Sequence, residues 1–150
     1  MHHGHYIPKP VQQALVINLK EKLVLPENYP EISRAIVKGF KFDIVSSIAH
    51  ETGLSATEIL NALNLPHRTT VQRRKHRCFN TAESNRIYAL IEVITAAEVL
   101  FDGNFPDAIR WLKKPCKALG KRLPVENVNS FFEFQQVIAV IHRLEYGVFN

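Results

Sequence analysis

The sequence predicts an all-α fold made of an N-terminal helix-turn-helix domain and a small C-terminal helical domain. From Glu31 onward, apolar residues recur at spacings of three and four, which is the period of an α-helix. Capping sequences precede several of these runs, and no segment after residue 30 has the alternation typical of a strand. The chain has 150 residues, of which 46% are apolar and 22% charged, so it is long enough for one compact domain or two small ones.

Residues 1–30 are expected to form an N-terminal arm. The first ten residues contain three histidines and two prolines without any helical pattern. The stretch Val11–Leu25 is rich in apolar residues but has no clear period, so neither helix nor strand is predicted there. Pro26 and Pro30 then interrupt the chain and mark the entry to the first ordered unit.

Residues 31–78 are predicted to form the helix-turn-helix domain. Helices are expected over 31–40 and 42–51, the second ending at Gly53, and a third begins at the capping box Ser55-Ala56-Thr57-Glu58. Thr69 or Thr70 is expected to cap a short fourth helix that runs through Arg77. Ala49, Gly53 and Ile59 have the spacing of a helix-turn-helix, in which the glycine takes the turn between two crossing helices.

Residues 79–150 are predicted to form the second domain. Asn80 can cap the longest helix, over 80–102, and Glu92 and Glu98 are expected to face solvent on it. A helix follows Asn104, a turn is expected over 117–120, and a capping box Ser130-x-x-Glu133 opens the last helix. This half carries more apolar surface than about 70 residues easily bury, which favours a partner or self-association over a merely well-packed small core.

The positive charge is confined to the first half. Residues 1–78 carry 11 basic and 6 acidic residues, whereas residues 79–150 carry 8 of each, so the whole net charge of +5 lies before residue 79. Residues 66–77 contain five Arg or Lys and no acid. Such a block attracts a polyanion, usually nucleic acid, although basic stretches are also often simply solvated surface.

A helix-turn-helix beside an acid-free basic block predicts sequence-specific DNA binding, with dimers on palindromic half-sites. Arg73 and Arg77 share one helical face and are expected to grip phosphates, or to read bases if their helix enters the groove. The third helix is the default reader of the major groove, and the arginine-rich helix competes with it. The predicted DNA-binding residues are Ser55, Ala56, Thr57, Asn61, Arg68, Thr69, Thr70, Gln72, Arg73, Arg74, Lys75 and Arg77.

Several functional classes are disfavoured. No nucleophile elbow, glycine-rich phosphate loop or H-E-x-x-H sequence is present, so the chain is not expected to be an enzyme or to need a cofactor or small-molecule substrate. His76-x-Cys78 lacks a second ligand pair, and His2, His3 and His5 are expected in the arm, so no metal site is predicted. Two cysteines, no secretory signal and no membrane span favour the cytoplasm.

Two stretches resemble the antitoxin family Xre/MbcA/ParS. One is Leu65–Lys75 followed by Glu83-Ser84-Asn85-Arg86-Ile87, and the other is Ala97–Phe101 followed by Ala108-x-x-Trp111-Leu112-x-x-Pro115. The likeness continues through Ala118-Leu119-Gly120, Pro124 and the ending Ile141-x-Arg143-x-Glu145-Tyr146-Gly147, and it covers roughly residues 31–149.

The resemblance implies a bacterial type II antitoxin that binds a RES-domain toxin acting on NAD+. It also implies repression of the antitoxin's own operon through promoter DNA. The family's terminal segment lies at the entrance of the toxin's active site, and that role transfers first to Arg143 and Tyr146. The toxin-binding residues implied in this way are Trp111, Arg143, Glu145, Tyr146 and Gly147.

Two other functions are compatible with the sequence. One is a helix-turn-helix repressor whose C-terminal domain only dimerises, and it differs in having no protein partner for the C-terminus. The other is a basic adaptor for RNA or a membrane surface, which predicts no preference for its own promoter over random duplex.

Overall fold

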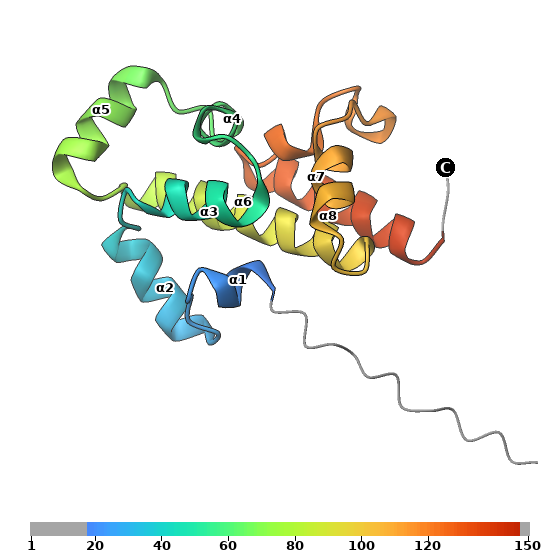
Figure 1. Cartoon of the computed structure of the whole chain (residues 1–150), viewed down its shortest axis with the longest axis horizontal. Coiled ribbons are helices and arrows are strands. Elements are labelled where there is room, and N and C mark those ends of the chain that lie inside the picture. The colour runs from blue at the N-terminus through green and yellow to red at the C-terminus, as the bar shows by residue number, and fades with distance from the viewer. Residues whose placement is uncertain (1–17, 148–150) are drawn as a thin grey trace, which may run out of the picture.

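A computed structural model describes residues 18–147 of the chain. Within this range the fold is all-α, as predicted, and two isolated bridges, Lys41 with Cys78 and Cys116 with Arg122, are the only β-type pairing. Figure 1 shows the helices in order. They are α1 (Leu19–Lys22), α2 (Tyr29–Lys38), α3 (Ile44–Thr52), α4 (Ala56–Ala62), α5 (His67–His76), α6 (Thr81–Leu100), α7 (Phe105–Leu112), the 3₁₀ turns η1 (Lys117–Leu119) and η2 (Pro124–Glu126), and α8 (Phe131–Glu145).

The long helix α6 is the centre of the fold. Helices α1, α2, α7 and α8 all contact it, so it carries buried apolar side chains around its circumference rather than along one stripe. No helix among residues 18–147 combines the length and the apolar character needed to cross a bilayer. The fully buried apolar side chains of α6 are Ile87, Leu90, Ile91, Val93, Ile94 and Ala97.

One continuous core joins the two halves of the chain. It includes Ile48 and Ile59 before residue 79 and Leu112 and Ile141 after it. The predicted arm also contributes from residue 18 onward, because Leu19 is fully buried on α1. The first part of the predicted arm, with its three histidines, lies outside the described residues. The proposed domain limits at 30 and 78 stay a prediction.

Most of the predicted helix caps are confirmed, but two predictions at helix starts are corrected. Capping boxes form at Ser55 with Glu58 and at Asn80 with Glu83, and the Asn104 side chain caps α7. Ser130 caps α8, yet the Glu133 carboxylate accepts from Arg122 at 2.9 Å instead of closing a third box. Helix α5 begins at His67 and is capped by Pro66, not by Thr69 or Thr70 as predicted, because Pro66 fits the extended cap position and its backbone carbonyl accepts the first helical hydrogen bond.

Glu98 lies in the core, and its predicted exposure is wrong. Its side chain on α6 is only 1% exposed, and neither carboxylate oxygen has a hydrogen-bond partner among the described residues. Burial raises the pKa of Glu98 more than the neighbouring Leu19 backbone and Lys22 ammonium lower it. Glu92, six residues earlier, is half-buried and forms an ion pair with Lys20 of α1, so both acids face α1 rather than solvent.

The buried Glu98 carboxyl predicts a pH-dependent stability difference. Because the folded-state pKa is raised, the stability of the wild type relative to Glu98→Gln is expected to be highest below the unfolded pKa of about 4.3 and to fall as pH rises through the folded pKa. Urea unfolding of both proteins between about pH 4 and 8 measures this difference. A difference that stays constant over this range contradicts the assignment.

Gly39 lies where the end of α2 passes close to the segment just before α6. It adopts φ +93°, and a Cβ built on it lies 2.1 Å from the Phe79 carbonyl oxygen. Here the Phe79 N–H donates to the Phe40 carbonyl at 2.8 Å, and the Phe42 N–H donates to the Arg77 carbonyl at 2.8 Å. Two chain segments can therefore approach closely only because residue 39 has no side chain.

Gly39→Ala is expected to destabilise the protein strongly. The backbone clash with Phe79 and the positive φ together cost about 3 kcal/mol or more of unfolding free energy. Chemical denaturation measures the loss. Gly53→Ala is the matched control, because Gly53 also has a positive φ but a Cβ added to it would meet no atom within 4 Å. Equal losses in the two variants would show that φ alone, not the approach to Phe79, sets the cost.

Candidate nucleic-acid and partner interfaces

Helices α3 and α4 form the predicted helix-turn-helix pair. Gly53 ends α3 in the left-handed conformation, with φ 79°, and Ser55 caps α4 two residues later. Ile48 and Ile59 are fully buried between the helices, and Ala49 is half-buried as expected for a small residue near the crossing. The Thr52 hydroxyl donates to the Ile48 carbonyl at 2.7 Å, which fixes the last turn of α3.

Helix α4 exposes a narrow polar edge. Ala56, Thr57 and Asn61 are exposed, as predicted for base-reading positions. Ser55 is also exposed, but its hydroxyl oxygen accepts from the Glu58 N–H at 3.0 Å and so belongs to the helix cap. Only seven residues long, α4 presents few side chains to a groove.

Residues of the C-terminal half contact α4. The Lys113 ammonium just after α7 lies 2.7 Å from a Glu58 carboxylate oxygen, and the Asn129 amide donates to the Ala62 carbonyl at 3.0 Å. The hydrogen bonds from Lys113 and then from the Ser55 backbone hold the pKa of Glu58 below its usual value. The predicted cap partner Glu58 therefore also joins α4 to α7, a contact that no local sequence pattern indicates.

Helix α5 presents the basic residues. Figure 1 shows it at one end of the long axis of the molecule, away from α7 and α8. The Arg74 guanidinium lies 5.5 Å from the centre of the Phe42 ring, a distance suited to a cation–π contact. Arg77 adopts φ 66° and ends the helix, so it does not continue the face of Arg73 as predicted. The predicted DNA-binding residues that are exposed here are Arg68, Gln72, Arg74, Lys75 and Arg77.

Three predicted DNA-binding residues on α5 face the protein to different degrees. Thr70 is buried and its hydroxyl donates to the Pro66 carbonyl at 3.2 Å, so it stabilises the first turn. Thr69 is half-buried on the first turn of α5. The Arg73 Nε lies 2.7 Å from a Glu83 carboxylate oxygen, and only 26% of the Arg73 side chain is exposed. Arg73 is therefore engaged inside the protein, unlike the other basic residues of this helix.

The predicted partner residues gather at the other end of the molecule. Tyr146 follows α8 and is 80% exposed, and Arg143 and Glu145 are exposed on the last turn. Gly147 has φ 71°, which turns the chain after the helix. Trp111 lies apart from them on α7 and is half-buried against the core. Four of the five residues thus lie together at the end of α8, where they are also adjacent in sequence, and the fifth lies on α7.

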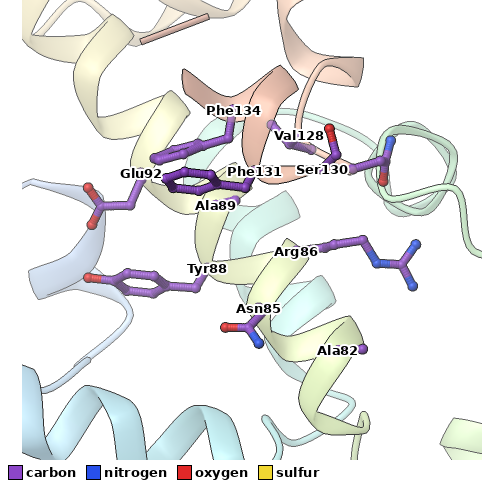
Figure 2. A pocket seen from close by; sticks show the side chains of 11 residues that line it. Ala82, Asn85, Arg86, Tyr88, Ala89, Glu92, Val128, Ser130, Phe131 and Phe134 are labelled. Atoms are coloured by element: carbon purple, nitrogen blue, oxygen red, sulfur yellow. The ribbon is translucent and has the colours of Figure 1, made fainter. Parts of the chain in front are cut away.

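A groove runs between the first half of α6 and the start of α8. Its volume is about 800 Å³, and Tyr88, Phe131 and Phe134 supply its aromatic walls. Figure 2 shows the two phenylalanine rings over α6, with Tyr88 and Glu92 on one side and Arg86 on the other. Loss of contact with water and the Glu92 carboxylate raise the pKa of Tyr88 to about 12. Phe131 and its neighbour Phe132 are 73% and 68% exposed, which agrees with the apolar excess predicted for this half.

Within residues 18–147, no three His, Cys, Asp or Glu side chains lie together as a metal site requires. Cys78 and Cys116 form no disulfide within the described residues and are half-buried.

Comparison with known proteins identifies the class. Residues 96–147 match the family profile described as the antitoxin Xre/MbcA/ParS C-terminal toxin-binding domain. All five predicted partner residues lie inside this match, and all predicted DNA-binding residues lie outside it.

Two curated relatives extend the similarity beyond that domain. The chain is 37% identical over 117 residues to an "Antitoxin Xre" of Yersinia enterocolitica, an alignment that covers 77% of this chain and 79% of the relative. It is 26% identical over 120 residues to an "Antitoxin Xre" of Photorhabdus laumondii, with 79% and 81% covered. The chain therefore belongs to the Xre family of antitoxins, whose members are regulators rather than enzymes.

Proposed function

We propose that this antitoxin neutralises a RES-domain toxin by covering its NAD+-binding active site with the end of α8, and represses its own operon through α4 and α5. The observation that carries the proposal is the separation of the two surfaces. A basic helix without acidic residues lies at one end of the molecule and an exposed Arg143–Tyr146 segment lies at the other, as Figure 1 shows.

The charge distribution supports the DNA-binding part. Arg68, Arg74 and Lys75 are exposed on a helix that lies next to the α3–α4 pair in sequence, and residues 66–77 contain no carboxylate to repel phosphates. Helix α4 offers Ala56, Thr57 and Asn61 at its exposed edge. Small side chains of this kind can reach base edges while α5 grips the backbone.

The exposure of the α8 end supports the toxin-binding part. Tyr and Arg are the residue types that most often dominate protein interfaces, and both stand out from the last turn of α8. Their position within the matched toxin-binding domain agrees with this role. The assignment of the partner as a RES-domain enzyme rests on the family resemblance, and the proposed setting is the bacterial cytoplasm.

The proposal includes a homodimer, because single helix-turn-helix units usually bind palindromic sites as pairs. Light scattering on the isolated antitoxin measures the assembly. A mass of one chain at concentrations that saturate promoter DNA would contradict this part alone.

The test of the main proposal uses the antitoxin gene with its neighbouring reading frame. Co-expression is expected to give a stable complex of the two proteins and to restore growth that the neighbour alone arrests. The antitoxin is also expected to bind its own promoter in preference to random duplex. Absence of a complex together with selective promoter binding would leave a repressor without a toxin partner. A lack of promoter preference would contradict the repressor role.

A further inference from the structure

Few packing contacts attach helix α5 to the rest of the protein. It has no extensive contact with any other helix of residues 18–147, and Thr70 is the one buried side chain among those described on it. Val71, its largest aliphatic residue, is mostly exposed. A helix without an apolar face cannot be oriented by hydrophobic packing, so polar contacts must fix its direction.

One carboxylate oxygen makes the strongest of these contacts. Glu83 Oε1 accepts from the Asn80 backbone N–H at 2.9 Å and from Arg73 Nε at 2.7 Å. The Glu83 side chain is only 4% exposed, so the pair is shielded from water and salt. The same oxygen therefore closes the cap of α6 and fixes the middle of α5 against it.

We propose that Glu83 is a positioning residue for DNA binding: through Arg73 it sets the orientation in which α5 presents Arg68, Arg74 and Lys75. This inference rests on the proposed DNA-binding role of α5. In this proposal Arg73 anchors α5 instead of contacting a phosphate. Glu83 then has two roles, since it caps α6 and also orients α5.

The proposal predicts that neutralisation of Glu83 weakens DNA binding, the opposite of what charge repulsion alone would give. A carboxylate close to a DNA-binding helix repels phosphates, so its neutralisation alone would tighten binding. If Glu83 orients α5, neutralisation instead loosens the helix and weakens binding. Gln is suitable as the replacement because it retains an oxygen for the Asn80 N–H, and Gln also occurs in capping boxes.

The first experiment compares promoter affinities of Glu83→Gln and Glu31→Gln. Glu31 is a matched control, since it is also the third residue of a helix behind an Asn cap, but it is exposed and takes no part in an ion pair with the described residues. Glu83→Gln is expected to bind about tenfold more weakly, from loss of a charge-assisted hydrogen bond. Glu31→Gln is expected to bind as well as wild type or slightly better. Tighter binding by Glu83→Gln, with a steeper salt dependence from a released Arg73, would overturn the proposal.

The second experiment needs no DNA. Hydrogen exchange of the full-length antitoxin is expected to be faster for amides 70–76 in Glu83→Gln than in wild type, with α7 and α8 unchanged. Unchanged exchange in α5 would overturn the positioning role. If the wild type binds no promoter DNA, the proposed function fails, and the exchange experiment still decides whether Glu83 holds α5.

A double-substitution comparison separates the pair from general charge effects. Because Glu83 acts through Arg73, adding Glu83→Gln to Arg73→Gln is expected to cause no further loss of promoter affinity. An additional tenfold loss in the double variant would overturn the proposal.

Discussion

Removal of residues 143–150 is expected to abolish protection against the toxin while promoter affinity stays at the wild-type level. The deletion takes away the last turn of α8 with the exposed residues Arg143, Glu145 and Tyr146. Of the described core side chains it removes only Leu144, which is half-buried against the core's edge. Aromatic and arginine side chains that act as hot spots of an interface each cost about 2 kcal/mol or more of binding free energy when truncated. Growth after toxin induction and promoter binding in vitro measure the two activities separately.

Single substitutions sharpen this test. Tyr146→Ala and Arg143→Ala are each expected to weaken the complex by at least about tenfold, in line with the loss of one dominant interface residue. Gln135→Ala is the matched control, because Gln135 is exposed on the same helix but lies near its start. Cells that survive toxin induction with the truncated antitoxin would show that the end of α8 does not cover the active site.

Replacement of Arg68, Arg74 and Lys75 by Ala is expected to produce the largest loss of promoter binding. All three are exposed on α5, and each phosphate contact contributes about 0.9 to the slope of log affinity against log salt. The slope should therefore fall by about 2 to 3, with a loss of affinity of at least about tenfold near 0.15 M salt. Titrations of promoter DNA at several salt concentrations measure both quantities.

The control for this variant removes the same charge from the opposite half. Lys114, Lys117 and Lys121 are exposed near the end of α7 and around η1, so their replacement by Ala lowers the net charge equally. Replacement of these three lysines is expected to change the slope of log affinity against log salt only a little. Equal slopes for both triple variants would mean that net charge, not α5, attracts the DNA. Binding of the toxin should be unaffected in the α5 variant.

The helices that were predicted best are those whose signals are local. The periodic apolar run and the Asn80 cap predict α6, and Ser55-x-x-Glu58 predicts the start of α4. Each of the two caps depends only on residues within one helical turn. The predicted cap of α5 at Thr69 or Thr70 lies too late in the chain, since no side chain caps this helix and Pro66 fits the position by its backbone alone. The predicted box at Ser130 was incomplete because Arg122, eight residues before it, attracts Glu133.

The contacts that could not be predicted join residues distant in sequence. Glu98 has the pattern of a surface acid until α1 is seen to cover it, and nothing in the spacing reveals that Leu19 packs on this side of α6. Arg73 has the pattern of a phosphate contact because basic residues surround it, and only the fold brings Glu83 to it. Glu58 similarly meets Lys113 across 55 positions of sequence. Sequence patterns indicate which surfaces carry charge. Ion pairs between residues distant in sequence determine which of these charges remain free to contact a partner.

The shared core around α6 has a consequence for how long each activity lasts. Because the α3–α4 pair and α8 are supported by one continuous set of buried side chains, residues 18–147 are expected to unfold in one cooperative step. The proposed gene repression and the proposed toxin inhibition are then expected to have a common lifetime, because removal of the unfolded chain would end both at the same moment.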